Sequence, residues 1–173
     1  LRSGRDVARI RMDRKRVLLV SRDDPEVLVI EKATGRLILA DITRGRNMSG
    51  VAPGEVKRLL VLEQLPAPFH NSPGFDGISL WGPFTIARIL GTVPVEQDGS
   101  AYFEAPVGKL VYFQAIDQHG SAVMSMRSGT YVHPGEKLTC QGCHERKKRP
   151  PTDPAYVPLA LKRPPAQIEP DVD

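Results

Sequence analysis

Residues 86–126 of this chain read IARILGTVPVEQDGSAYFEAPVGKLVYFQAIDQHGSAVMSM. Short apolar runs alternate here with turn signals, and the runs lie at 86–90, 92–95, 101–104, 109–116 and 121–126. Asp98-Gly99 predicts a type I′ hairpin turn, because both residue types tolerate the positive φ angles that this turn requires. Asp117 to Gly120 predicts a second turn. Strands and turns at so short an interval predict an antiparallel sandwich or barrel.

The sequence before this stretch predicts further short strands. Residues 1–16 are strongly basic, and we interpret them as a solvated arm or as an edge of an upstream domain. Apolar runs bounded by turn signals predict a β-meander, and they lie at 17–20, 27–30 and 37–40. Residues 44–55 read as a loop and 56–64 as a strand. The Pro- and Gly-rich residues 65–84 predict an irregular segment of the kind that often wraps a ligand.

The sequence after residue 126 changes character twice. Residues 127–139 are expected to run irregularly into a cysteine motif. Beyond that motif the chain is Pro-rich and reads as an extended segment over a partner or a neighbouring domain. We therefore predict a basic arm and meander at 1–45, a β-rich domain at 46–149 and a Pro-rich extended tail at 150–173.

Composition argues against two classes of function. The chain has 173 residues and a formal net charge of +4, both signs are interspersed, and only 6% of residues are aromatic. Nucleic-acid binding needs a concentrated basic face with stacking aromatics, so we expect no nucleic-acid partner. No apolar run approaches the roughly 18–20 residues that span a bilayer, so we expect no transmembrane segment. Because the sequence begins at Leu1, we expect an excerpt or a processed product.

The motif that carries chemistry is C-x-x-C-H, formed by Cys140, Gln141, Gly142, Cys143 and His144. This pattern is the attachment signature of c-type haem. Two thiols three positions apart can reach two vinyl groups on one porphyrin edge, and His144 can offer its imidazole to the iron as the proximal ligand. The motif uses both cysteines of the chain. We therefore predict one haem c on Cys140 and Cys143 and, because this attachment is made outside the cytoplasm, a periplasmic or otherwise extracytoplasmic location.

Other interpretations of the motif stay open. A thioredoxin-like dithiol is expected beside a βαβ pattern, which the flanking residues do not show. A structural zinc site needs four ligands. The two cysteines and a distant histidine could supply three or four, but His144 is awkwardly placed beside Cys143. A plain disulfide across two residues would restrain almost nothing.

The distal iron ligand has six candidates, namely His70, His119, His133, Met48, Met124 and Met126. His119 lies in a predicted turn and is expected to be solvated. Met124 and Met126 share one face of a predicted strand, and core packing accounts for one of them. We retain as candidate distal ligands His133, which precedes the motif, His70, which lies in the Pro- and Gly-rich segment, and Met126. An open iron site is the alternative.

Several pieces of sequence occur in a specific order, namely VAPGEVKRLLVL at 51–62, GTVPVEQDGS at 91–100, YFQA at 112–115, MRS at 126–128, PGE at 134–136 and CQGCHE at 140–145. Together they resemble the haem-bearing middle domain of the hydrazine synthase alpha-subunit-like family. The resemblance implies a β-rich domain in a large periplasmic-type protein that also has propeller domains. The meander at 17–40 would then be the last piece of an upstream propeller.

The resemblance also implies a catalytic haem that joins nitrogen species into hydrazine. In that family's active haem, a tyrosine just after the motif binds the iron, and the motif histidine binds zinc with a further cysteine and histidine. In this chain Glu145 to Arg149 follow the motif, the next tyrosine is Tyr156, and no third cysteine is present. These departures favour another use of the haem.

Two main functional hypotheses follow. The first is a mainly β, small antiparallel β-sandwich-like domain whose long irregular loops wrap a covalently attached c-type haem. It would transfer electrons within a larger periplasmic multidomain or multisubunit redox complex, with a redox partner protein or further subunits as partners. The second is a catalytic five-coordinate haem domain of a hydrazine-synthase-like enzyme acting on small nitrogen species. A docking module with an ancillary haem is a third, weaker hypothesis.

Overall fold

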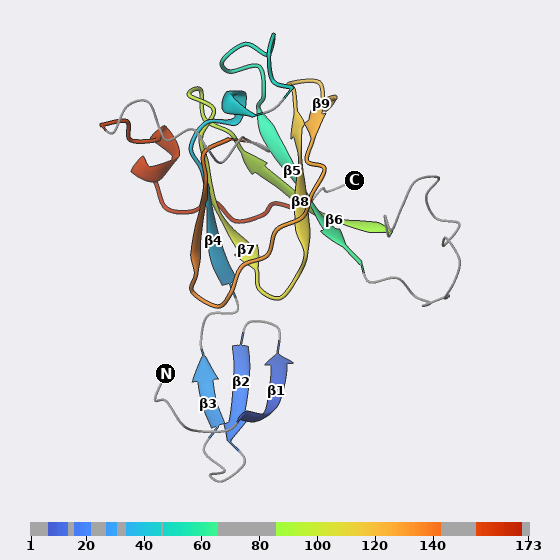
Figure 1. Ribbon diagram of the computed structural model, residues 1–173, viewed down its shortest axis with the longest axis vertical. Helices are drawn as coiled ribbons and strands as arrows, with labels where there is room; N and C mark the ends of the chain where they lie inside the picture. Colours follow the sequence, from blue (N-terminus) through green and yellow to red (C-terminus); the bar gives the residue numbers. More distant parts are fainter. Residues whose placement is uncertain are drawn as a thin grey trace.

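The computed structural model describes residues 7–13, 16–21, 27–30, 34–45, 47–65, 86–142 and 155–170, the first three ranges as backbone only (Figure 1). The described residues form β-strands with two single-turn 3-10 helices, so the mainly β prediction is confirmed. None of the helices in these ranges is both long enough and apolar enough to cross a membrane.

An N-terminal sheet consists of β1 (Val7–Asp13), β2 (Arg16–Ser21) and β3 (Val27–Ile30), which are antiparallel in that order. The runs predicted at 17–20 and 27–30 are therefore strands. β1 lies within the basic residues 1–16, and of the two interpretations of this segment its pairing with β2 favours an edge of a sheet. The basic composition of this segment conceals a period-2 alternation, in which Ile10 and Met12 alternate with charged residues, and such alternation is typical of a strand.

Two further sheets form the main body of the molecule. The first has the order β10-β4-β7, with β4 (Thr34–Leu39) antiparallel to β7 (Ala101–Pro106) and parallel to β10 (Lys137–Cys140). The second is antiparallel throughout and has the order β6-β5-β8-β9, formed by β6 (Ala87–Pro94), β5 (Arg58–Gln64), β8 (Val111–Ile116) and β9 (Ala122–Ser125).

Four predictions about individual segments and turns were wrong. The run at 37–40 lies in β4, which pairs with β7 and β10 and does not extend the N-terminal meander. β10 forms within a segment that we expected to be irregular. β6 and β7 do not pair as a hairpin, since they belong to different sheets. Of the residues Gln97, Asp98 and Gly99, only Gly99 has a positive φ, so the turn is not of type I′.

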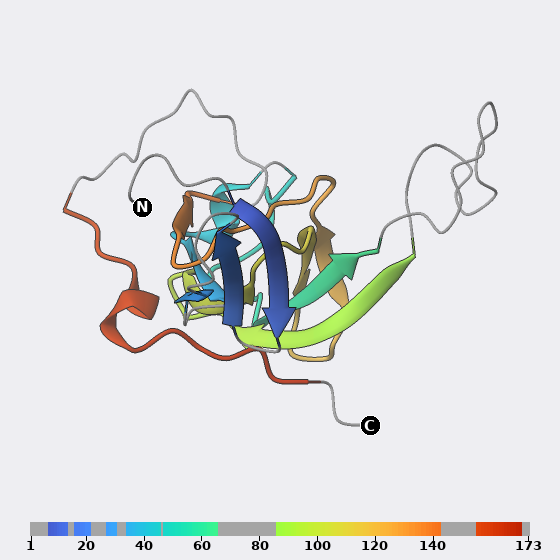
Figure 2. The ribbon, with the colours of Figure 1, turned by 90° about the horizontal axis from the view of Figure 1, so that it is seen from below.

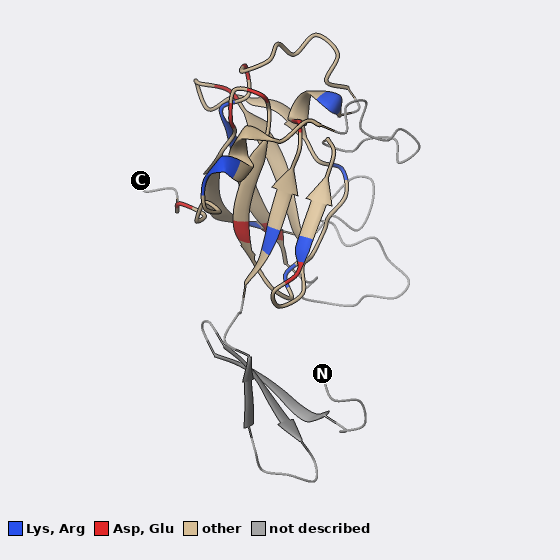
Figure 3. Cartoon of the chain, turned by 90° about the vertical axis from the view of Figure 1, so that its left-hand side faces the viewer, with Lys and Arg blue, Asp and Glu red and all other residues tan. Residues whose placement is uncertain are grey.

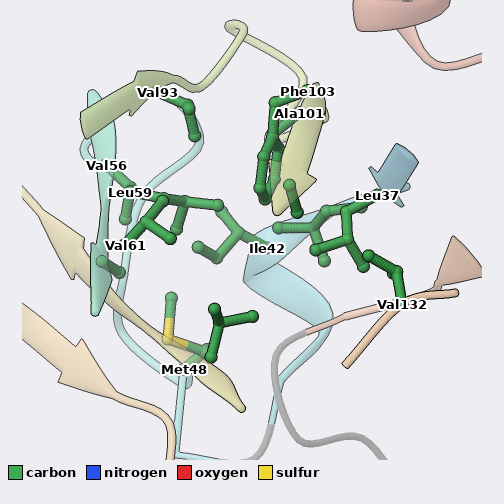
Figure 4. Close-up of a cluster of buried hydrophobic side chains, with 14 residues drawn as sticks. Leu37, Ile42, Met48, Val56, Leu59, Val61, Val93, Ala101, Phe103 and Val132 are labelled. Atoms are coloured by element: carbon green, nitrogen blue, oxygen red, sulfur yellow. The ribbon is translucent and has the colours of Figure 1, made fainter. Parts of the chain in front are cut away.

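The two sheets pack face to face around one apolar core (Figure 4). In β4 the residues alternate between buried and half-buried, so that Leu37 and Leu39 point into the core. Phe103 of β7 meets Phe113 of β8 across the sandwich as an edge-to-face pair, with ring centroids 5.7 Å apart. Such a pair adds about 1 kcal/mol to the area that the two rings bury.

The tail closes one side of this sandwich. Ala166 makes a parallel bridge to Phe103 of β7, and Glu169 makes an antiparallel bridge to Thr92 of β6. β7 and β6 are edge strands of the two sheets, so one segment satisfies the open edges of both. Figure 2 shows this segment in red along one side of the strands. The extended segment thus runs over strands of its own chain, whereas the three-part domain division stays a prediction.

Figure 3 colours the positions of Lys and Arg blue and those of Asp and Glu red, and both occur at several places along the described chain. One carboxylate is nearly buried: Glu63 of β5 is 8% exposed. It accepts hydrogen bonds from Arg88 at 2.5 and 3.0 Å and from Lys109 at 2.9 Å. Burial by itself raises the pKa of Glu63, but the bonds from Arg88 and Lys109 outweigh it and leave this pKa below its usual value. The charged carboxylate of Glu63 therefore links β5 to Arg88 of β6 and to Lys109, which lies just before β8.

We predict that Glu63→Gln lowers the free energy of unfolding at pH 7 by about 2 kcal/mol, the contribution of hydrogen bonds to a charged acceptor. Because the folded pKa is depressed, this contribution is present above the unfolded pKa of about 4.3 and is lost as pH falls through the folded value. Urea unfolding of parent and variant between pH 7 and pH 3 measures it. The exposed Glu55→Gln is the control. A difference between parent and Glu63→Gln that did not shrink at low pH would contradict the prediction.

The tail contact depends on Gly91. Its φ is +134°, and a Cβ at this position would lie 2.1 Å from the carbonyl oxygen of Glu169. We predict that Gly91→Ala destabilises the fold by about 3 kcal/mol, since it adds backbone strain and displaces the tail. Gly108→Ala is the matched control, because Gly108 has φ +68° with open space around it, and strain alone costs about 1 kcal/mol there. Equal losses in the two variants, measured by urea unfolding, would show that the tail contact contributes nothing.

Candidate functional site

The first motif cysteine lies at the end of a core strand. Cys140 is the last residue of β10, and its register partner is Leu39 of β4. Beyond this pair, the Ala40 amide donates to the Cys140 carbonyl at 2.8 Å and the Asp41 amide donates to the Gln141 carbonyl at 2.9 Å. The backbone pairing of β4 therefore continues into the motif and fixes where Cys140 leaves the sheet.

The third motif residue packs against the 3-10 helix η1 (Ile42–Arg44). Gly142 is buried, and a Cβ on it would lie 2.8 Å from the carbonyl carbon of Arg44 and 3.0 Å from the amide nitrogen of Gly45. Asp41 caps η1 by accepting from the Thr43 amide at 2.9 Å and the Thr43 hydroxyl at 2.6 Å. The absence of a side chain at the third position is thus what lets the motif approach η1.

Beside the motif lies an apolar pocket of about 70 Å³. The side chains around it come from both sheets, namely Leu37, Ile38, Leu39, Leu59, Phe103, Phe113, Met126, Cys140 and Gly142. Cys140 is half-buried at this pocket. β10 and β9 are the sheet edges opposite those that the tail covers, and Cys140 ends β10 while Met126 follows β9. The pocket therefore lies between the edges that the described tail residues leave uncovered.

Of the candidate distal ligands, the structure brings Met126 together with Cys140. The Met126 amide donates to the Phe113 carbonyl at 2.8 Å, which continues the pairing of β9 with β8 to this residue. Met124 packs half-buried against the core but is not among the residues that line the pocket. Met48 is a core residue with 2% exposure.

His133 lies at the other end of β4. Its carbonyl oxygen is beside Gly35, and its amide donates to Glu136 at 2.7 Å. Gly35 and Leu39 are four residues apart, which is about 13 Å along a strand. The exposed ring of His133 packs edge-to-face against Tyr131, with ring centroids 5.4 Å apart. The structure therefore places His133 away from the Cys140 end of β4.

The remaining predicted site residues fall in two groups. His119 is exposed in the turn between β8 and β9, as the sequence predicted. Cys143, His144 and His70 lie outside the described residues, so their roles stay predictions.

Tyr156 is a residue near the motif that sequence reasoning missed. Its hydroxyl lies 2.7 Å from Asp98 and 3.1 Å from the Ala40 carbonyl. Burial, and then the hydrogen bond to Asp98, raises the pKa of Tyr156. The pKa of Asp98 is lowered in turn, because bonds from Ser100, Leu159 and Tyr156 outweigh the effect of its burial. No local pattern signals this contact, since 58 residues separate Asp98 from Tyr156.

Comparison with known proteins places this arrangement in a family. A sequence profile of the hydrazine synthase alpha subunit middle domain matches residues 54–145, which is more than half of the chain. A solved structure of Kuenenia stuttgartiensis hydrazine synthase matches with a TM-score of 0.59 over 84% of this chain, at 18% sequence identity, which shows a shared fold. This chain spans 22% of that chain. No curated protein sequence matches. The chain therefore belongs to the family of the hydrazine synthase alpha subunit middle domain.

Proposed function

We propose that this domain carries one c-type haem on Cys140 and Cys143 and passes electrons within a larger extracytoplasmic redox assembly. His144 would be the proximal ligand and Met126 the distal ligand. The observation that supports this most directly is that the first cysteine of a C-x-x-C-H motif and a methionine line the same apolar pocket. Membership of the hydrazine synthase alpha subunit middle-domain family is compatible with this role and with a catalytic one.

The apolar side chains that line the pocket suit one edge of a porphyrin, but the pocket does not have the volume for a whole ring. The pocket of about 70 Å³ is too small to enclose a porphyrin, so it could take only one edge of the ring. Leucine and phenylalanine side chains would cover that edge. Each thiol would add across one vinyl group, forming a carbon–sulfur bond while its hydrogen goes to the neighbouring carbon. This addition needs no oxidant.

A bound haem would supply an iron centre that gains and loses one electron. The roles of the chain's own residues follow from their chemistry. The imidazole of His144 and the thioether of Met126 would both bind the iron, which would leave no iron position for a substrate. A methionine ligand would raise the reduction potential. The apolar lining would keep water from the ring edge beside Cys140, which would disfavour the more highly charged oxidation state.

A second function is favoured by one observation, the match to a domain of a synthase. In that case the distal position would be open, and the domain would act on small nitrogen species as part of a hydrazine-synthase-like enzyme. The occupancy of the distal position separates the two functions. Because this chain spans 22% of the solved hydrazine synthase chain, further domains or subunits of an assembly would complete either one.

We predict that the chain, produced with periplasmic haem maturation, carries one covalent haem and gives a low-spin spectrum that carbon monoxide does not change when reduced. Mass spectrometry of the intact chain and optical spectra measure this. Cys140→Ser should lose most covalent attachment through the first thioether. A high-spin iron that binds carbon monoxide would instead support the catalytic function. A chain without haem absorbance that retains zinc would refute the haem proposal.

Met126→Leu tests the distal ligand. We predict that this variant keeps its covalent haem but becomes partly high-spin and binds carbon monoxide when reduced, because leucine has no donor atom for iron. Its reduction potential should fall, since a thioether ligand raises it. Met124→Leu is a matched control, because Met124 lies two residues away and packs half-buried against the same core. If the Met126 and Met124 variants both behave like the parent, the distal ligand is another residue.

A further inference from the structure

Asp98, in the turn between β6 and β7, binds the tail through its carboxylate. Asp98 accepts hydrogen bonds from the Ser100 amide at 3.1 Å and hydroxyl at 2.6 Å, which shape the turn. Its other oxygen accepts from the Tyr156 hydroxyl at 2.7 Å and from the Leu159 amide at 2.8 Å. The buried Ser100 hydroxyl also accepts from the Ala160 amide at 3.0 Å. Asp98 therefore binds the tail at two points, namely the side chain of Tyr156 and the backbone of Leu159.

The Tyr156 hydroxyl shares its proton with a second acceptor, the carbonyl oxygen of Ala40 at 3.1 Å. The Ala40 amide donates to the Cys140 carbonyl at 2.8 Å. Ala40, which directly follows β4, thus contacts the tail through its carbonyl oxygen and the motif through its amide nitrogen. The next residue, Asp41, repeats the contact to the motif at Gln141. Gly99 is packed against this segment, since a Cβ on it would lie 2.7 Å from the Asp41 carboxylate.

The other anchors of the tail lie elsewhere. Arg163 donates to Glu96 at 2.7 Å and to the Tyr102 carbonyl at 3.3 Å. The Ala166 amide donates to the Tyr102 carbonyl at 2.9 Å. These contacts hold the tail on β7 and its preceding turn without touching Ala40 or Asp41. The tail therefore has one contact to Ala40, the residue whose amide donates to Cys140, whereas the contacts of Arg163 and Ala166 only hold it on β7 and the turn before β7.

We infer that Tyr156 is a positioning residue for the attachment site. Its hydroxyl, fixed by Asp98, holds the Ala40 peptide so that the backbone of Cys140 presents the thiol to the porphyrin edge. This inference rests on the proposed function. It assigns to the tail a task beyond closing the sheet edges, since the segment after the motif helps to set the geometry of its first cysteine.

Tyr156→Phe tests the inference, because it keeps the ring and removes the hydroxyl. In the chain without haem, amide hydrogen exchange at Ala40 and Asp41 should become about fivefold faster, the factor expected for one lost hydrogen bond. In the matured chain, the fraction with covalent haem should fall, and the reduction potential of the remaining haem should shift. Tyr131→Phe is the control, since Tyr131 is an exposed tyrosine away from the motif.

Arg163→Gln separates positioning from docking. It should speed amide exchange at Ala166 while leaving Ala40, Asp41 and the haem like the parent. Unchanged exchange at Ala40 and Asp41 in Tyr156→Phe would overturn the inference, as would an equal effect of Arg163→Gln on the two amides. A parent chain that takes up no haem would refute the proposed function, yet the exchange data would still decide whether Tyr156 positions the motif backbone.

Discussion

The pairing of β4 with two strands far away in the sequence is the constraint on which the rest of the main body depends. β4 lies between β7 and β10, so it joins residues 101–106 and 137–140 into one sheet. Its inward residues, Leu37 and Leu39, fill the core and also line the pocket. The same ladder continues through Ala40 to Cys140. Core packing and the position of Cys140 in the C-x-x-C-H motif therefore both depend on one strand.

The two open sides of the sandwich differ in whether the tail covers their edge strands. On one side, the tail pairs with β7 and β6, which removes two open edges where another chain could add a strand. On the other side, the edges β9 and β10 flank an apolar pocket that the described residues do not fill. Under the proposed function, one edge of the haem would lie at this pocket.

Local patterns predicted much of this fold. Short apolar runs between turn signals gave the positions of β2, β3, β5, β8 and β9, and spacing alone identified the motif that begins at Cys140. Features that depend on distant partners were missed. β10 is four residues long, and only its parallel register with β4 makes it a strand. Asp98-Gly99 read as a hairpin turn, but the Asp98 carboxylate binds Ser100, Leu159 and Tyr156, and the flanking strands diverge into different sheets. No local pattern contains such information.

The family match covers residues 54–145, whereas β4 and the tail lie outside it. Yet Ala40, directly after β4, donates its amide to the Cys140 carbonyl, and the Tyr156 hydroxyl of the tail binds the carbonyl of that same Ala40. Residues outside the matched range 54–145 therefore also contact the backbone of Cys140. It follows that a change in β4 or the tail can alter the setting of Cys140 while the C-x-x-C-H sequence stays the same. Reactivity within such a family then depends on what surrounds the motif as much as on the motif itself.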